Sequence, residues 1–339
     1  MLYPAVRYRC FELATILDMG LATQTALFSV SRQHSYLWNL IAFLVLAFFF
    51  ATPITLAIEK GKITKLSLLV YNTHGLPTIF AKDRPRERFP EIVRLTHDYD
   101  ISLLQEDFAH HDLVLKHAKE GQSIQRGEGA KTGKCLFCSG SGLTLMSNLS
   151  EVDWRVSAIF EPFENCSGWL NRANDCFAQK GFQIIDLRSI GGEEVVLVNT
   201  HLDAGRSDLD RAARAAQLDQ LVLVVDGYVS DQALIVAGDL NLDWDNPEDR
   251  ELLFDFRDRL GLARAEKGVQ AEKGWRVLDY IFFRSGKQTT LKVATSGEDR
   301  TFVSGGVPLS DHPALFVRFN IHQSFARFAP NIIVLRTER

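Results

Sequence analysis

The chain has 339 residues, a formal net charge of −4, 46% hydrophobic residues and 24% charged residues. This length suits one large domain or two small ones, and the composition is that of an ordinary globular protein. The slightly negative total excludes a general basic excess that would indicate a nucleic-acid surface, although a local basic patch can exist within a near-neutral total.

An uncharged apolar stretch, Tyr36–Ile58, lies near the start of the chain. A membrane-spanning helix needs ~20 such residues, so we expect a transmembrane or signal-anchor helix at 36–58 after an N-terminal segment at 1–35. A cleaved signal peptide starting at Met19 and a buried core helix are the alternatives, and uniform apolarity disfavours the core helix. The lysines that follow the stretch favour a C-terminus on the inside.

The cysteines favour the outside instead. An even set, Cys135, Cys138, Cys166 and Cys176, follows an export-like segment, and this is typical of disulfides. Half of a zinc site at Cys135 and Cys138, or four buried thiols, are the alternatives. We expect a membrane-anchored or exported protein with its catalytic domain outside the cytoplasm. Cys166 and Cys176 are the favoured disulfide pair, because they lie close together in a loop-like stretch.

Short apolar runs predict the strands of a single catalytic domain at residues 62–321, followed by a C-terminal tail at 322–339. The expected strands cover residues 66–71, 101–104, 143–146, 181–187, 195–199, 233–237, 278–283 and 314–319.

Three helices and one long loop are expected between these strands. The helices cover residues 89–97, with Pro90 at the start, residues 109–120, and a segment that Ser207 caps and that ends at Val225. The buried face of the last helix is expected to carry Ala212, Ala215, Leu218, Val222 and Val225. Residues 122–142 are rich in Gly, Ser and Lys and are expected to form the loop.

Four of the apolar runs end in a polar residue: Asn72, Glu106, His201 and Asp239. Strands that lie side by side bring such ends to one edge of the fold, where binding sites commonly form. Each residue alone is better explained as a solvated strand end, but four in succession favour a site. Glu106 is a hard oxygen ligand suited to Mg²⁺, and His201 can bind a phosphate oxygen or protonate a leaving alkoxide.

The pair Asp311–His312 adds a candidate base. Histidine with a near-neutral pKa is the usual group that activates water, so His312 is a candidate general base. Asp311 either orients this imidazole or bonds elsewhere, because adjacency in sequence does not establish pairing. Asn241 offers both a donor and an acceptor to a phosphate oxygen.

The site motifs, in chain order, are Asn72, Q-E at 105–106, T-H-L at 200–202, G-D-L-N at 238–241, L-D-Y-I at 278–281 and S-D-H at 310–312. Over residues 66–319 this ordered set resembles the endonuclease/exonuclease/phosphatase superfamily. The resemblance implies an α/β fold, a four-layer sandwich with two central mixed β-sheets flanked by helices. It also implies Mg²⁺-dependent phosphoester hydrolysis by water, with Mn²⁺ or Co²⁺ as substitutes in vitro.

The resemblance also assigns roles to the matching residues. Glu106 takes the metal role with Asn72 close by, Asp239 and Asn241 position water and phosphate, His201 binds the phosphate, and His312 is the base or transition-state partner. Whether Asp239 or His312 removes the proton from water stays open.

One further element, Asp175–Gly181, resembles the D-x(4)-K-G element of the neutral sphingomyelinase branch. In that branch the residues matching Asp175 and Lys180 belong to a loop that rearranges over the site, so both are predicted substrate-binding residues. The alternative for this pair is a solvated surface contact of little energetic weight. The sequence shows no clear exposed aromatic hairpin like that of secreted bacterial members.

These observations predict a monomeric, membrane-associated phospholipase C that hydrolyses sphingomyelin to phosphocholine and ceramide. A Mg²⁺-dependent nuclease or phosphatase of the same superfamily is the first alternative, and a nuclease requires a basic groove and a steep salt dependence. A catalytically inactive binding module is the alternative of a different class, and the complete ligand set disfavours it.

Overall fold

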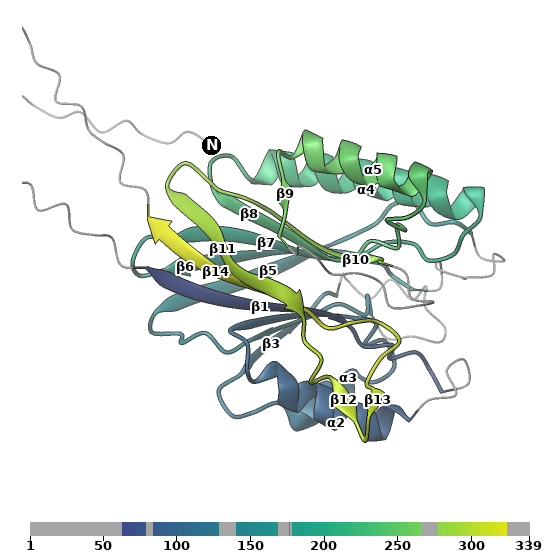
Figure 1. Ribbon diagram of the computed structural model, residues 1–339, viewed down its shortest axis with the longest axis horizontal. Helices are drawn as coiled ribbons and strands as arrows, with labels where there is room; N and C mark the ends of the chain where they lie inside the picture. The colour runs from purple at the N-terminus through teal and green to yellow at the C-terminus, as the bar shows by residue number, and fades with distance from the viewer. Residues whose placement is uncertain are drawn as a thin grey trace, which may run out of the picture. The chain divides into compact units, whose positions relative to one another are not determined.

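The computed structural model describes residues 63–78, 84–128, 140–168, 176, 178–265 and 277–323, and two six-stranded sheets form its centre (Figure 1). The first sheet contains, in spatial order, β11 (Thr289–Glu298), β14 (Leu315–Gln323), β1 (Thr64–Asn72), β2 (Ile101–Gln105), β4 (Thr144–Ser147) and β3 (Ser123–Arg126). The second sheet contains β5 (Trp154–Pro162), β6 (Gly181–Ser189), β7 (Glu194–His201), β8 (Ala233–Asp239), β10 (Asp279–Arg284) and β9 (Ala263–Arg264).

Both sheets are mixed. In the first sheet β1 and β2 are parallel, and in the second sheet β7 and β8 are parallel, while the remaining neighbours are antiparallel. A short hairpin, β12 (Val303–Ser304) with β13 (Val307–Pro308), lies between β11 and β14 in the chain. The parallel pairs matter most for function, because their carboxyl ends point to the same edge of their sheets.

The helices form the two outer layers. Figure 1 shows α4 (Asp208–Tyr228) and α5 (Pro247–Arg259) on one side of the two sheets, and α2 (Pro85–Thr96) and α3 (His111–His117) on the other. Side chains alternate between the faces of β1, so that Leu68 packs between the sheets while Leu69 packs with the helical layer at Phe89. On the opposite side Val236 packs with Leu221 of α4. The predicted sandwich with two mixed sheets and flanking helices is confirmed.

No helix within these described ranges is long and apolar enough to cross a membrane, and the predicted anchor at 36–58 lies outside them. The expected loop at 122–142 is wrong at its start, where β3 pairs with β4. The helix expected at 89–97 begins earlier, with Pro85 in its first turn, and Pro90 lies inside it. The helix expected at 109–120 is shortened to α3.

Helix α4 begins as predicted, and Leu218, Val222 and Val225 of its expected core face are buried, whereas Ala215 is half-buried. The Ser207 side chain accepts from the Asp210 amide, and Asp210 accepts in return from the Ser207 amide, which completes a capping box. Beyond this cap Ala213, rather than the expected Ala212, faces the core. The Arg214 side chain is also buried, because its guanidinium donates to backbone carbonyls of the preceding loop.

Candidate active site

The polar strand ends meet at one edge of the sandwich. Asn72 ends β1, Glu106 follows β2, His201 ends β7 and Asp239 ends β8. Asn72 joins the two sheets, because its Nδ2 donates to Glu106 Oε1 at 3.0 Å and to Asp239 Oδ2 at 2.9 Å. The structure therefore brings together residues that are far apart in the sequence but share one position in the fold.

The turn after β8 places two of these side chains. Gly238 has a φ of 144°, and a Cβ there would lie 1.9 Å from the Thr200 carbonyl oxygen, so the strand approach requires glycine. Asn241 has a φ of 51°, a left-handed conformation that asparagine tolerates better than most residues. The backbone N–H of Asn241 donates to Asp239 Oδ1 at 2.9 Å, and this bond holds both side chains near His201.

His201 is buried among hydrogen-bond donors. Its Nε2 lies 3.2 Å from Lys180 Nζ and 3.1 Å from Asn241 Nδ2, so these partners assign Nε2 as the acceptor of a neutral ring. Burial, together with the positive charges of Lys180 and His312, lowers the pKa of His201 well below its ordinary value. His201 is therefore uncharged in this arrangement, and its Nε2 also lies 3.6 Å from Glu106 and from Asp239.

His312 has the opposite environment. Burial opposes its charged form, but the carboxylates of Asp279 and Asp239 outweigh burial and raise the pKa of His312 well above its ordinary value. Its Nδ1 lies 2.8 Å from Asp279 Oδ2, and its Nε2 lies 3.8 Å from Asp239 Oδ2. Burial in turn raises the pKa of Asp279 to about 6, in spite of the nearby His312 charge.

Asp311 does not orient His312. Its Oδ1 lies 3.2 Å from His74 Nδ1, and its side chain is 59% exposed. Asp279, at the start of β10, takes the orienting position instead. Sequence reasoning quoted the L-D-Y-I motif but assigned no role to its aspartate, because the pairing crosses from one sheet to the other. The carboxylate of Asp279 is fully buried in the structure, and the sequence offers only an aspartate at the start of an apolar run, which does not name its partner.

The donor set at Glu106 fits a hard divalent cation such as Mg²⁺. Ligand atoms of Glu106, His201 and Asp239 lie within 4.8 Å of one another, as do those of Asp239, Asp279 and His312. Burial raises the pKa of Glu106, and the hydrogen bond from the neutral Asn72 only partly offsets this. A carboxylate with only 15% of its side chain exposed is stabilised by a cation, and Mg²⁺ typically uses one or two protein carboxylates.

The predicted metal role of Asn72 stays a prediction. Its Oδ1 accepts from the His74 amide at 3.0 Å, so the amide group presents nitrogen rather than oxygen to Glu106. A contact between Asn72 and a cation would require the amide to turn. In this structure Asn72 links the two carboxylates as a donor.

Lys180 lies inside the site and not in a solvated surface pair. Its side chain is buried, and its Nζ donates to the Leu202 carbonyl at 2.8 Å in addition to its contact with His201. The other half of the predicted pair, Asp175, lies outside the described residues. Lys180 therefore places a positive charge beside the predicted phosphate position.

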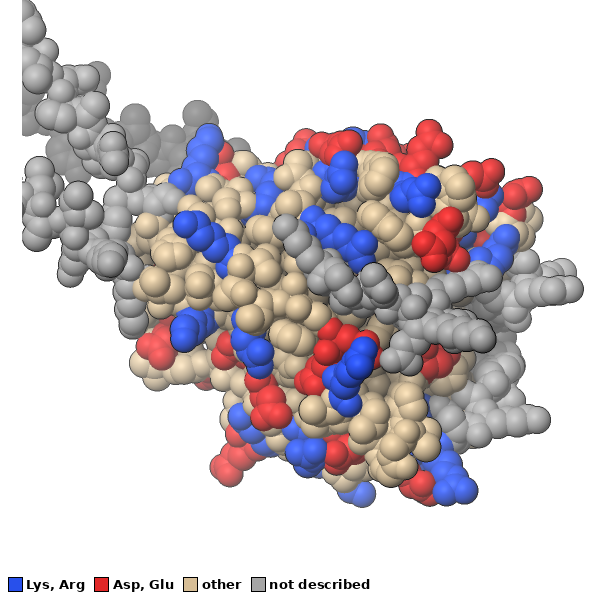
Figure 2. Space-filling model, viewed as in Figure 1, with Lys and Arg blue, Asp and Glu red and all other residues tan. Residues whose placement is uncertain are grey.

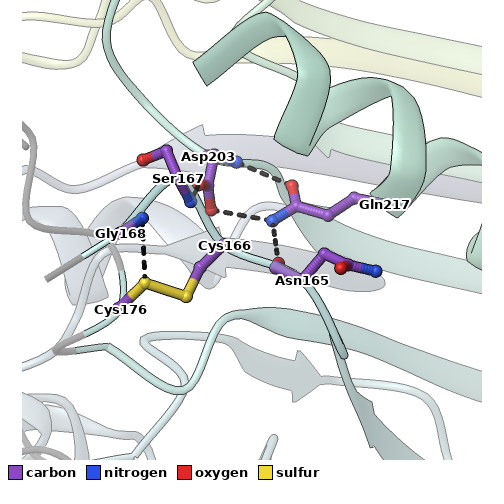
Figure 3. Close-up of a disulfide and its surroundings, with 7 residues drawn as sticks. All are labelled: Asn165, Cys166, Ser167, Gly168, Cys176, Asp203 and Gln217. Carbon is purple, nitrogen blue, oxygen red and sulfur yellow. Dashed lines mark hydrogen bonds between the residues drawn. A yellow bond between two sulfur atoms is a disulfide. The ribbon is translucent and has the colours of Figure 1, made fainter. Parts of the chain in front are cut away.

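A disulfide between Cys166 and Cys176, the pair favoured from sequence, closes the loop that precedes Lys180 (Figure 3). The Gly168 amide donates to Cys176 Sγ at 3.1 Å, and the Ser167 amide donates to Asp203 Oδ2 at 2.6 Å. Figure 3 shows how Gln217 of α4 completes this arrangement, donating to Asp203 Oδ1 at 2.7 Å. The disulfide thus ties Cys176, four positions before Lys180, to Cys166. The bond from Ser167 ties the same segment to Asp203, two positions after His201.

The fold places the chain in the class of α/β sandwich proteins with two central mixed sheets. The model of the Endonuclease/Exonuclease/phosphatase family matches residues 69–312, and the chain belongs to this family. It is 28% identical over 274 residues to sphingomyelinases of Mycobacterium bovis and Mycobacterium tuberculosis. The match covers 75% of this chain and 52% of those proteins, so the chain spans about half the length of these curated relatives.

Solved structures share the fold at lower identity. Sphingomyelinase C from Streptomyces griseocarneus has 21% sequence identity and a TM-score of 0.55, over 75% of this chain and 99% of that chain. Beta toxin from Staphylococcus aureus with bound magnesium ions has 19% identity and a TM-score of 0.54, over 77% and 100%. TDP2 of D. rerio, complexed with a single strand DNA product, has 17% identity and a TM-score of 0.57, over 76% and 99%.

Proposed function

We propose that this protein is a Mg²⁺-dependent phosphodiesterase that hydrolyses sphingomyelin on the ceramide side of its phosphate, releasing phosphocholine and ceramide. The observation that carries the proposal is the cross-sheet contact of Asn72 with Glu106 and Asp239, which faces two histidines of opposite protonation state. The similarity to mycobacterial sphingomyelinases supports the choice of a lipid substrate.

The reaction breaks one P–O bond and forms another. A water held by Asp239 attacks phosphorus, and Asp239 accepts a proton from this water. His312, charged because of its carboxylate neighbours, donates a proton to the departing ceramide oxygen. Asp279 holds the ring of His312 so that Nε2 faces Asp239. When bound at Glu106, Mg²⁺ neutralises the charge that develops on the phosphoryl oxygens.

In this proposal the residues around His201 hold the phosphate. Lys180 and Asn241 carry N–H donors and lie within 3.2 Å of the uncharged His201. Positive charge and preorganised donors stabilise the transition state more than the ground state, because charge accumulates on the phosphoryl oxygens as the bond breaks. The predicted substrate-binding role of Asp175, which lies outside the described residues, belongs to the same proposal.

The proposal places the catalytic domain outside the cytoplasm, attached through the segment at 36–58 or released from it, and acting as a monomer. The disulfide between Cys166 and Cys176 supports this placement, because structural disulfides persist in oxidising compartments. The membrane then supplies both the substrate and the surface on which the enzyme works.

A nuclease is the second candidate, supported by the shared fold of TDP2 in complex with a DNA product. Such an enzyme relies on a run of Lys and Arg along the phosphate path. Figure 2 shows Lys and Arg interspersed with Asp and Glu over the coloured residues of the displayed face. The preference for the lipid substrate rests on the similarity to the mycobacterial sphingomyelinases.

The two candidates are separated by one panel of substrates. Purified full-length protein is incubated with sphingomyelin vesicles, phosphatidylcholine vesicles, single-stranded DNA and duplex DNA, each in Mg²⁺ and in EDTA. Phosphocholine release from sphingomyelin in Mg²⁺ alone is the expected result. Mg²⁺-dependent cutting of DNA without phosphocholine release would replace the lipid assignment by the nuclease. No product from any substrate would favour an inactive binding module.

A further inference from the structure

A cluster of polar side chains lies directly behind Glu106. Asp107 is fully buried, and its Oδ2 contacts His111 Nδ1 and accepts from Thr144 Oγ1 at 2.7 Å. Arg126 of β3 donates from Nη2 to the Phe108 carbonyl at 3.2 Å, and the same nitrogen lies 3.6 Å from Asp107 Oδ1. This Asp107 cluster, made of Asp107, His111, Arg126 and Thr144, joins the loop after β2 to β3, β4 and α3.

The backbone that this cluster holds has an uncommon conformation. Glu106 has a φ of 60°, in the left-handed region that residues other than glycine rarely adopt. On the other side of the chain the Gly75 amide donates to the Glu106 carbonyl at 2.7 Å, and a Cβ at Gly75 would lie 2.3 Å from that oxygen. Such conformations persist only where surrounding contacts determine them, and here those contacts come from Gly75 and from Asp107.

Asp107 takes no part in the candidate metal groups of the described residues, although it follows Glu106 directly. Its Oδ2 faces His111 and Thr144, and its Oδ1 faces Arg126. The side chains of Glu106 and Asp107 therefore serve two different groups of partners.

We propose that Asp107 is a positioning residue, whose contacts with Thr144, His111 and Arg126 hold the Glu106 carboxylate in place for the metal ion. The inference rests on the proposed metal role of Glu106. Outer-shell partners of metal ligands typically contribute 10- to 100-fold in metal affinity. Asp107 belongs to this class through the backbone, since it fixes the conformation of the ligand's own residue.

The test measures Mg²⁺ binding to full-length protein by calorimetry and by the Mg²⁺-dependent rise in melting temperature. Asp107→Asn keeps the shape of the side chain and removes its charge. Asp100→Asn is the matched control, because Asp100 lies just before β2, at the opposite edge of the same sheet, and accepts from the Ser67 amide at 2.7 Å and its hydroxyl at 2.6 Å. Thr144→Val is a milder variant of the cluster.

We expect Asp107→Asn to weaken Mg²⁺ binding by roughly 10- to 100-fold, and Thr144→Val to weaken it by a smaller factor. Asp100→Asn should leave Mg²⁺ binding unchanged, even if its melting temperature falls as far as that of Asp107→Asn. Excess Mg²⁺ should restore the turnover of Asp107→Asn, which a general loss of structure would prevent.

If Asp107→Asn bound Mg²⁺ as tightly as the wild type, the positioning role of Asp107 would be overturned, while the metal site itself would stand. If Asp107→Asn does not fold, unchanged Mg²⁺ affinity in Thr144→Val has the same consequence. Absence of Mg²⁺ binding by the wild type would instead refute the metal role of Glu106, and the inference with it.

Discussion

The two sheets contribute two unlike rims to the site. The first rim consists of Asn72, Glu106 and His312, and the second rim consists of Lys180, His201, Asp239, Asn241 and Asp279. Each rim holds a histidine whose Nε2 lies within 4 Å of the same oxygen, Asp239 Oδ2, at 3.6 Å for His201 and 3.8 Å for His312. Nevertheless the pKa of His201 is lowered and that of His312 is raised.

The difference shows that neighbours, not residue type, assign the chemistry. Burial first, and then the ammonium of Lys180, lower the pKa of His201 and hold it neutral, whereas the carboxylates of Asp279 and Asp239 outweigh burial at His312 and hold it charged. When the surroundings of two titratable groups shift their pKa values in opposite directions, the groups usually serve as separate acid and base. The two rims also have different supports nearby. Thr144 donates a hydrogen bond to Asp107, next to Glu106 of the first rim, whereas the Cys166–Cys176 disulfide precedes Lys180 of the second rim.

Removal of the first rim's carboxylate should have the largest effect. Glu106→Ala takes away the proposed metal ligand, and we expect a loss in kcat/KM of more than about 3 kcal/mol, or over a hundredfold, with the fold retained. Steady-state kinetics in Mg²⁺ and circular dichroism together measure this. Full activity of the folded variant in Mg²⁺ would refute the metal assignment.

The orienting aspartate should come next. Asp279→Asn removes the charge that contributes most to the raised pKa of His312, so this histidine should approach the neutral behaviour of His201. We expect kcat/KM to fall by roughly a hundredfold, about 2.7 kcal/mol, because a misoriented catalytic histidine is a large loss in related triads. An NMR titration of His312 provides the independent readout. An unchanged His312 pKa in the variant would contradict the pairing.

Asp279 also marks where prediction from sequence ended. The ends of β1, β2, β7 and β8 were predictable, since each buried apolar run stops at a polar residue of ligand type. The partner of His312 was not, because a sequence shows neighbours along the chain, and Asp311 stood closer than Asp279. Contacts between two sheets depend on how they stack, which no local pattern encodes.

Elements with weak patterns were missed for a related reason. β5 alternates between buried and exposed positions and carries polar residues, and α5 is rich in charged residues, so neither presents an apolar run. β3, with the sequence SIQR, has a single apolar residue and pairs with β4 alone at the edge of its sheet, so no apolar run marks it as a strand. Tertiary packing, and not local propensity, decides such segments.

The disulfide of the second rim should contribute to stability more than to chemistry. Its cysteines are 10 positions apart, and in the chain-entropy model a loop of this length corresponds to roughly 2 to 3 kcal/mol. Replacing both cysteines by serine should lower the free energy of unfolding by about this amount in denaturant titrations. Dithiothreitol should then have no further effect at this position. Mass spectrometry that finds both thiols free in native protein would count against the disulfide and the export proposal.

Lys180→Ala changes the second rim's histidine directly. The ammonium is one cause of the lowered pKa of His201, after burial, so its removal should let that pKa rise. We expect about a tenfold loss of turnover on a soluble phosphodiester, in the range of a lost charge-assisted hydrogen bond. The loss on sphingomyelin vesicles should be larger if the loop covers the lipid phosphate, with Lys292→Ala, exposed on β11, as the control. Equal losses on both substrates would restrict Lys180 to holding His201.

The smallest effect is expected at Asp311, which sharpens the comparison between sequence neighbour and spatial neighbour. Burial would raise the pKa of this carboxyl, but the hydrogen bond from His74 and the charge of His312 lower it to about 2. A carboxyl whose pKa is lowered in the folded protein stabilises the fold at pH values above the ordinary pKa of 3.8. This contribution is lost as the pH falls through the pKa of the folded state, about 2. Because the side chain is 59% exposed, Asp311→Asn should cost less than about 1 kcal/mol at neutral pH.

Melting curves of wild type and Asp311→Asn should therefore differ slightly at pH 7 and converge as the pH approaches 2. Turnover should stay within about threefold of wild type, while Asp279→Asn loses roughly a hundredfold, because Asp279, and not Asp311, contacts the ring proposed to donate the proton. If the two variants lost activity equally, the adjacent aspartate would share the orienting role, and the contact between the two sheets would not be enough to set the protonation of His312.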